Sequence, residues 1–173
     1  MATSRTTFLA CLMALTGCGR GEFTMSADQQ AILRDADQIA LLSLQPGSLG
    51  NEPADGFHGY EVLGRATLKG AERARIVGAF LDAADESDGT VAACFEPRHG
   101  IRAIRDRETV DFVICFECLQ VAVYAGDEEA GYFTITDTPL PVFNETLRDA
   151  GIPVAPSFLL GTDSHADESI ETE

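Results

Sequence analysis

Between residues 90 and 136 the chain alternates short apolar runs with polar breaks, and this rhythm restricts the fold more than any other feature. The runs are rich in Val, Ile, Phe, Tyr, Thr and Cys, a composition typical of β-strands. The breaks between them contain Gly, Pro, Asp and Glu. Because such short connections favour antiparallel neighbours, the pattern predicts an antiparallel sheet. Its strands are expected at residues 90–95, 101–105, 110–115, 119–124 and 132–136.

Three stretches before and after residues 90–136 have the pattern of helices. Ser26 and Gln29 have the spacing of a capping box, which marks a helix start. An apolar face recurs every 3.6 residues between 69 and 86. A third helix is expected near the C-terminus, where apolar residues recur at helical spacing ahead of a Gly and a Pro, at Phe143, Leu147, Ala150, Gly151 and Pro153.

Residues 38–44 and 60–68 supply two further candidate strands. The fold class predicted is therefore α+β, with a mainly antiparallel sheet of five to seven strands and about three helices packed on it. A chain of 173 residues suits one domain, which we expect over residues 26–158. Residues 159–173 are acidic and nearly free of large apolar side chains, and so are expected to form a disordered tail.

The charge of the chain argues against one class of partner. Only 12 basic residues accompany 28 acidic ones, and the formal net charge is -16. Binding to a nucleic-acid backbone requires clustered Lys and Arg, so no nucleic-acid partner is expected. Four arginines do gather near residue 102, but acids lie beside them in the same hairpin, and we expect ion pairs there. The residues concerned are Arg98, Arg102, Arg105 and Arg107, with Asp106, Glu108 and Asp111.

The N-terminus has the organisation of a targeting segment. Arg5 provides a positive charge, and residues 8–15 form an apolar run that is too short to span a bilayer. Residues 15–18 then read Leu-Thr-Gly-Cys. This segment resembles the lipobox of bacterial lipoproteins, in which an aliphatic residue and two small ones precede an obligatory Cys.

The resemblance implies a role for each residue of the segment. Leu15, Thr16 and Gly17 would be recognised by the signal peptidase, residues 1–17 would be removed, and Cys18 would be lipidated. Residues 18–25 would then be a lipidated tether, and the membrane would be the first partner of the protein through its lipid. Gly19 in place of Asp favours the outer membrane, with the domain in the cell envelope facing the periplasm or the surface. The alternative is an ordinary secretory signal that leaves Cys18 as a free thiol.

Two cysteine-containing segments carry the strongest chemical pattern. Residues 94–100 read Cys-Phe-Glu-Pro-Arg-His-Gly, and residues 114–118 read Ile-Cys-Phe-Glu-Cys. If the strands 101–105 and 110–115 pair across a turn near Arg107, Cys115 lies opposite Gly100 and close to His99. Three thiolates and one imidazole suit zinc, as a structural site if all bind and as a catalytic one if a position stays open. The ligand set predicted is Cys94, His99, Cys115 and Cys118.

Other interpretations of these cysteines stay open. A disulfide from Cys94 to Cys115 or Cys118 fits an oxidising compartment. A bridge between Cys115 and Cys118 is excluded if both lie in a regular strand, where their Cα atoms would be about 10 Å apart. The thiols could equally be buried and inert, with His99 serving the turn by hydrogen bonding. Redox catalysis is less favoured, because the flanks of the Cys-x-x-Cys segment predict strands and not the helix on which such centres open.

Residues 43–124 resemble a group of small bacterial proteins that share a CF-x-PRHG segment and a later ICF-x-C segment. This resemblance implies a shared fold and nothing about a reaction. No Gly-x-Ser-x-Gly, His-Glu-x-x-His or Walker sequence is present. The sequence thus favours a lipid-anchored, non-enzymatic envelope module that binds an unidentified protein or small molecule or has a structural role. The alternative is a zinc metalloprotein.

Overall fold

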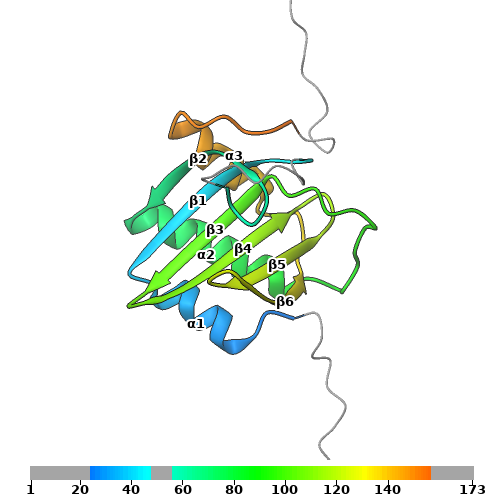
Figure 1. Ribbon diagram of the computed structural model, residues 1–173, viewed down its shortest axis with the longest axis horizontal. Helices are drawn as coiled ribbons and strands as arrows, with labels where there is room; N and C mark the ends of the chain where they lie inside the picture. Colours follow the sequence, from blue (N-terminus) through cyan, green and yellow to red (C-terminus); the bar gives the residue numbers. More distant parts are fainter. Residues whose placement is uncertain (1–23, 48–55, 157–173) are drawn as a thin grey trace, which may run out of the picture.

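The computed structural model describes residues 24–47 and 56–156 (Figure 1). The predicted signal peptide at 1–17, the lipidation site at Cys18 and most of the tether at 18–25 lie outside the described residues, as does the tail at 159–173. Within the described ranges, no helix is both long enough and apolar enough to cross a membrane.

The described chain forms six strands and three helices, which confirms the predicted α+β class. Every neighbouring pair of strands is antiparallel, and the strand order is β2-β1-β3-β4-β5-β6. The elements are α1 (Ala27–Asp35), β1 (Gln38–Gln45), β2 (Glu61–Leu68), α2 (Gly70–Asp85), β3 (His99–Arg105), β4 (Glu108–Cys115), β5 (Gln120–Ala125), β6 (Glu128–Thr134) and α3 (Leu140–Asp149).

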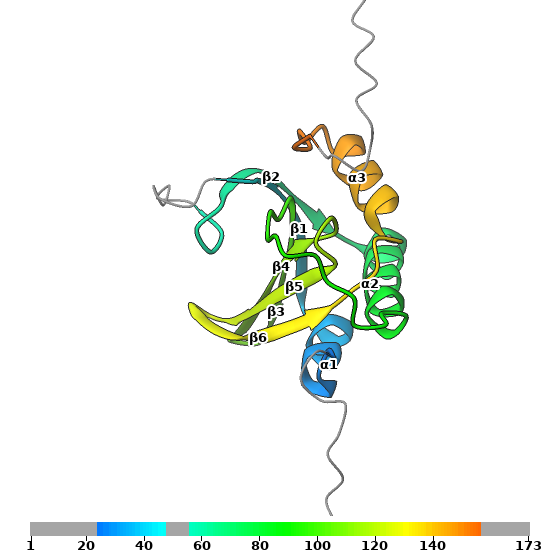
Figure 2. The ribbon, with the colours of Figure 1, turned by 90° about the vertical axis from the view of Figure 1, so that its right-hand side faces the viewer.

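The three helices lie on one face of the sheet (Figure 2). α1 begins with the capping box that the sequence predicts, since Ser26 Oγ accepts from the Gln29 N–H while the Gln29 side chain accepts from the Ser26 N–H. The core beneath the helices is aromatic at its centre. The Phe80 ring of α2 contacts Phe112 and Phe133 edge-on, with centroids 5.6 and 5.9 Å away. These edge-to-face contacts and the apolar area they bury hold the helices on the sheet.

The opposite face of the sheet carries a second, smaller cluster of buried apolar residues. A short segment at residues 57–60 folds over it, closed by a bridge between Phe57 and Tyr60. The Phe57 ring lies against the backbone of Gly100 so closely that an added Cβ would be 2.7 Å from its Cε1 atom. Gly100 is therefore a position where the absence of a side chain lets a ring cover the sheet.

The strand predicted at residues 90–95 is wrong, because the chain forms an irregular connection there between α2 and β3. We call this connection the 86–98 loop. Its apolar residues do not alternate between a buried and an exposed face, and Val91 is 50% exposed. β-type residues form a strand only where a neighbouring strand accepts their backbone groups and their side chains find cover. The loop instead runs beside the turn that joins β4 to β5.

The pairing of β3 with β4 also differs from the predicted register by two residues. Gly100 pairs with Val113, not with Cys115. The reason is the turn, which contains only Asp106 and Arg107 between Arg105 and Glu108. Asp106 has φ 55°, the left-handed conformation that tight two-residue hairpins require and that Asp tolerates.

Candidate functional site

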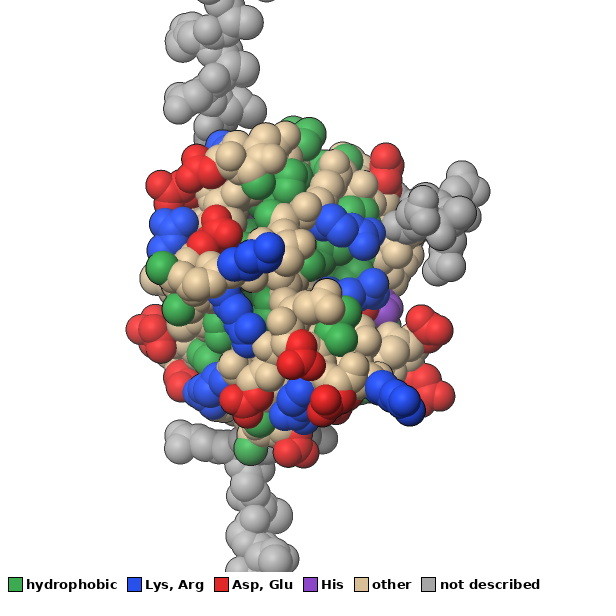
Figure 3. Space-filling model, turned by 90° about the vertical axis from the view of Figure 1, so that its left-hand side faces the viewer, with side chains coloured by type: hydrophobic (Ala, Val, Ile, Leu, Met, Phe, Trp, Pro, Cys, Tyr) green, Lys and Arg blue, Asp and Glu red, His purple; other side chains and the backbone are tan. Residues whose placement is uncertain are grey.

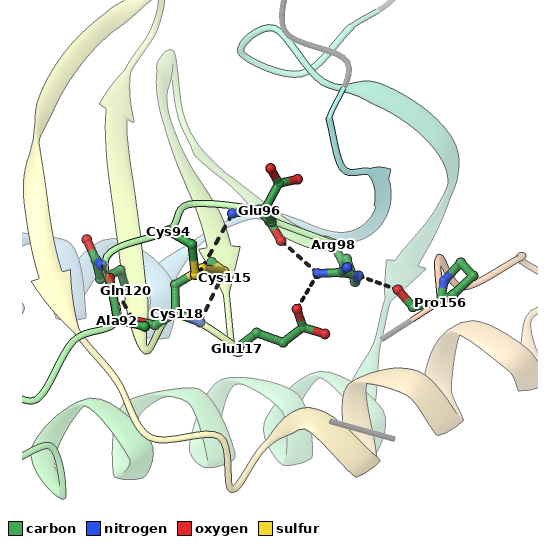
Figure 4. Close-up of a disulfide and its surroundings, with 9 residues drawn as sticks. All are labelled: Ala92, Cys94, Glu96, Arg98, Cys115, Glu117, Cys118, Gln120 and Pro156. Carbon is green, nitrogen blue, oxygen red and sulfur yellow. Dashed lines mark hydrogen bonds and ion pairs between the residues drawn. A yellow bond between two sulfur atoms is a disulfide. The ribbon is translucent and has the colours of Figure 1, made fainter. Parts of the chain in front are cut away.

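Three sulfur atoms meet where β4 ends (Figure 4). β4 stops at Cys115, residues 116–119 form a turn, and Leu119 takes a left-handed conformation with φ 57°. The turn brings the Cα atoms of Cys115 and Cys118 to 5.2 Å, and the two residues form a disulfide. The exclusion of this bridge assumed extended backbone and is therefore wrong. A turn gives the Cα separation that a disulfide needs, and an extended strand does not.

Cys94 supplies the third sulfur and comes from the 86–98 loop. Its thiol is free and exposed, and its Sγ lies 2.9 Å from Cys118 Sγ. The predicted disulfide from Cys94 to Cys115 or Cys118 is thus not the one present, because Cys115 and Cys118 are bonded to each other. Nevertheless Cys94 touches the existing disulfide directly. The three sulfur atoms gather in one corner, as the sequence predicts.

Backbone N–H groups point at both sulfurs of the disulfide. The Cys118 N–H donates to Cys115 Sγ at 3.2 Å, and the Glu96 N–H donates to Cys118 Sγ at 3.4 Å. Two further bonds fix the loop beside the turn. The Ala92 N–H donates to the Cys118 carbonyl at 3.1 Å, and the Gln120 side-chain amide donates to the Ala92 carbonyl at 2.8 Å. The loop that carries Cys94 is therefore held to the β4–β5 turn on both sides of the cysteine.

A buried arginine joins this corner to the C-terminal part of the described chain. Arg98 is 7% exposed, and its guanidinium lies 2.8 Å from Glu117 Oε2 and donates to the Glu96 carbonyl at 3.0 Å. It also donates to the Pro156 carbonyl. Hydrogen bonds between ionised partners are stronger than neutral ones, so Arg98 fixes three segments that are distant along the chain.

His99 does not join the three sulfurs. Side chains alternate between the faces of a strand. His99 pairs with Ile114, which packs in the core under the helices, whereas Cys115 follows on the opposite face, that of Val113. The predicted four-ligand zinc set is accordingly not assembled. Among the described residues, no group of three or more His, Cys, Asp and Glu side chains is placed to hold a metal ion.

The surroundings of His99 explain where its ring goes. It is 1% exposed, its Nε2 lies 2.8 Å from Asn144 Oδ1, and its ring contacts Phe116 and Phe143 edge-on. Burial lowers the pKa of His99 to about 4; the nearby charge of Arg98 acts in the same direction, and the hydrogen bond to Asn144 opposes it. His99 is therefore a neutral core residue at pH 7. Its hydrogen-bond partner is Asn144 of α3, whereas the sequence prediction had it serving the turn.

A second polar cluster lies on the opposite face of the sheet. Asp111 is fully buried and accepts hydrogen bonds from Arg102 Nε and Nη2 at 2.8 and 2.6 Å, while His58 Nε2 lies 2.8 Å from its Oδ2. The His58 ring stacks on Tyr124, with 3.8 Å between centroids. Burial alone would raise the pKa of Asp111, but the hydrogen bonds from Arg102 and His58 outweigh it, and the pKa of this carboxyl is lowered.

Arginine pairing follows the sequence prediction in part. Arg102 binds Asp111 and Arg105 lies 2.9 Å from Glu108, both within the β3–β4 hairpin, whereas Arg98 pairs with Glu117. The side view in Figure 3 shows basic and acidic side chains interspersed on that face, with hydrophobic ones visible between them. Charges on this face therefore do not separate into one basic and one acidic area.

Three partners in these clusters were missed by sequence reasoning. Asn144 lies in α3, 45 residues from His99, and nothing local announces the contact. Glu117 lies between the two disulfide cysteines, and its pairing with Arg98 depends on the turn. The sequence did contain one indication that Asp111 has a partner such as His58. Asp111 lies within the apolar run at residues 110–115, and a buried carboxylate needs partners.

No family model matches the chain, and neither a curated protein nor a solved structure matches it. The resemblance of residues 15–18 to a lipobox, and of residues 43–124 to a group of bacterial proteins, stay predictions.

Proposed function

We propose that the protein is a bacterial lipoprotein whose α+β domain is held at a membrane of the cell envelope and acts by binding or as a structural component. The observation that carries the proposal is the Leu-Thr-Gly-Cys sequence at residues 15–18, which follows a positively charged and then an apolar segment. Several acyl chains hold a protein on a membrane where a single chain would dissociate.

The disulfide between Cys115 and Cys118 supports this location. Disulfides form and persist in oxidising compartments such as the bacterial periplasm, and are rare in the cytosol. The polar clusters on both faces have a structural role within the domain. Asp111 is satisfied by Arg102 and His58, and His99 is enclosed by aromatic rings, so these groups serve the fold.

Anchoring at Cys18 would hold the domain close to the lipid. α1 begins at Ala27, so residues 18–26 separate the acylated residue from the first helix. At most about 3.5 Å per residue, this tether reaches about 30 Å. The domain would therefore work near the membrane surface, on partners that are themselves at or close to that surface.

Substitution of the acylated residue tests the proposal. The full-length precursor and its Cys18→Ser variant are expressed in a Gram-negative host, and the membrane fraction and intact mass are measured. We expect the unchanged chain in the membrane fraction with an acyl mass increase, and the variant unprocessed and without that increase. Cys11→Ser, which removes a thiol from the apolar run, is the matched control and should behave like the unchanged chain. An acylated Cys18→Ser chain that stays in membranes would overturn the proposal.

A further inference from the structure

We propose that Cys94, Cys115 and Cys118 form a thiol–disulfide exchange site, in which the exposed Cys94 takes over the buried disulfide and passes it to an external thiol. The inference goes beyond membrane anchoring and does not depend on it. It rests on three observations: the contact between Cys94 and Cys118, the contrast in exposure between Cys94 and the disulfide, and the N–H groups directed at both bonded sulfurs.

The three cysteines differ in their exposure to solvent, and this gives them different roles. Cys115 and Cys118 are 1% and 0% exposed, so a thiol in solution cannot reach their disulfide directly. Cys94 is exposed. Thiol–disulfide exchange requires the attacking sulfur to contact the sulfur it attacks. Cys94 Sγ already lies 2.9 Å from Cys118 Sγ and is held there by the loop, which replaces a bimolecular encounter with an intramolecular one.

The internal step exchanges one disulfide for another. Cys94 loses its thiol proton to water, and the thiolate attacks Cys118 Sγ. A bond forms between Cys94 and Cys118 as the bond between Cys118 and Cys115 breaks, and Cys115 leaves as a thiolate that takes up a proton. Cys94 is oxidised and Cys115 is reduced, so the step needs neither an oxidant nor a reductant.

The backbone N–H groups stabilise the thiolates that leave in the two steps. Hydrogen bonds to a thiolate stabilise its charged form, and a more stable thiolate leaves faster. Cys115 Sγ, the leaving atom of the internal step, accepts from the Cys118 N–H at 3.2 Å. Cys118 Sγ, the leaving atom when an external thiol attacks, accepts from the Glu96 N–H at 3.4 Å.

The external step uses a thiol as the co-reactant. After the internal step, a thiolate from solution attacks Cys94 Sγ in the new disulfide, forms a mixed disulfide with Cys94, and releases Cys118 as a thiolate. A second thiol then attacks the mixed disulfide and frees Cys94. In sum, one protein disulfide and two external thiols become two protein thiols and one external disulfide.

The site also lies at the far end of the strands from α1. α1 leads into β1, whose first residue pairs with the last part of β3. Cys115 ends β4 beside the first residue of β3, and Figure 1 shows the β4–β5 turn and α1 at opposite ends of the strands. A thiol partner would therefore approach the domain on the side away from α1.

Reduction kinetics test the role of Cys94. The full chain in detergent is treated with dithiothreitol, and loss of the Cys115–Cys118 disulfide is followed by acid quenching, alkylation and peptide mass mapping. We expect Cys94→Ser to slow the loss at least tenfold, because reduction then waits for local opening of the fold. Val91→Ser changes an exposed residue of the same loop and should stay within twofold of the unchanged chain. Equal rates for Cys94→Ser and the unchanged chain would overturn the proposal.

The identity of the bonds provides a second, independent readout. Without reductant, a fraction of the unchanged chain should carry an alkylated Cys115 together with a Cys94–Cys118 disulfide. Cys115→Ser in oxidised glutathione should form the Cys94–Cys118 disulfide completely. Free thiols at both Cys94 and Cys118 in that variant, with a folded circular dichroism spectrum, would overturn the proposal. So would a zinc ion that the reduced chain holds against reoxidation. Neither result touches the anchoring proposal, which is read at Cys18.

Discussion

The two faces of the sheet each hold a histidine next to an oxygen atom, and they do so in different ways. Under the helices, His99 lies 2.8 Å from an amide oxygen of Asn144 and among phenylalanine rings. On the other face, His58 lies 2.8 Å from a carboxylate oxygen of Asp111, which also binds a guanidinium. On the helix-covered face His99 is therefore kept neutral, whereas the other face buries the charge of Asp111 and neutralises it with partners.

The two faces therefore depend on different protonation states. Burial of His99 stabilises the neutral ring, so protonation opposes folding there. Burial of Asp111 is tolerated because Arg102 and His58 donate to its carboxylate, so the charged form is required. The two faces should consequently fail under different changes of residue and of pH.

The largest effect is expected from removing the buried carboxylate. Asp111→Ala leaves Arg102 and His58 without their shared acceptor, and we expect a loss of about 3 kcal/mol in the free energy of unfolding. Urea titration at pH 7 measures it. Glu108→Ala is the matched control, since it removes an acid that is 56% exposed and pairs with Arg105 in the same hairpin. Exposed pairs contribute at most about 1 kcal/mol, and equal losses in both variants would remove the distinction between buried and exposed pairs.

A smaller and pH-dependent effect is expected on the helix-covered face. Because the pKa of His99 is lowered from 6.5 to about 4, the unfolded chain binds the proton more tightly than the folded one. Stability contributed by neutral His99 is therefore full above pH 6.5 and is lost as the pH falls toward 4. We expect a loss of about 2 kcal/mol between pH 7 and pH 5. Thermal unfolding at several pH values measures it.

His99→Gln sharpens this result, since its amide can still donate to Asn144 Oδ1 and does not titrate. This variant should lack most of the loss between pH 7 and pH 5. It should keep the loss that Asp111 causes at lower pH, because a lowered carboxyl pKa gives stability that disappears only below its ordinary value of 3.8. A His99→Gln curve parallel to that of the unchanged chain above pH 4 would contradict the assignment of the slope to His99.

The smallest effect concerns two glycines on the two faces. Gly100→Ala places a Cβ 2.7 Å from Phe57 Cε1, and the ring is 1% exposed and cannot move freely. We expect a loss of about 1.5 kcal/mol. Gly78→Ala in α2 meets nothing within 4 Å and should raise stability by up to about 1 kcal/mol, because Ala favours helix. Calorimetric midpoints that shift in the same direction for both variants would contradict this contrast.

The secondary structure was predictable where local pattern and final environment agree. The apolar run at residues 110–115 became β4, in which both faces of that run are buried. The 3.6-residue period at 69–86 became α2, which buries the face that its pattern presents. The run at residues 90–95 has β-type residues as well, but its neighbours are the Cys118 carbonyl and the Gln120 side chain, not another strand. Composition cannot report whether a partner strand is present.

The candidate site was predictable in its position and in its three cysteines, and wrong in including His99. Pairing of the hairpin strands correctly brings residues near 99 and 115 to the same end of the sheet. A register of neighbours does not say that their side chains share a face, and the alternation of the strand sends His99 into the core and Cys115 to the opposite face. The disulfide was missed because its exclusion assumed extended backbone from Cys115 to Cys118, although the predicted strands end at residue 115 and resume at 119, and a turn lies between them.

The residue pattern was enough to predict most of the elements and their antiparallel pairing, with the strand at residues 90–95 as the exception. Hydrophobic period, capping and turn residues act over a few neighbouring positions, so they can be recognised locally. The sequence also supplied the proposed acylation site at Cys18, which requires only a short linear pattern. Tertiary structure decided which sulfur bonds to which, which histidine is kept neutral, and which acid Arg98 meets. These outcomes depend on distances and dielectric surroundings set by segments far apart in the chain, and no local pattern encodes them.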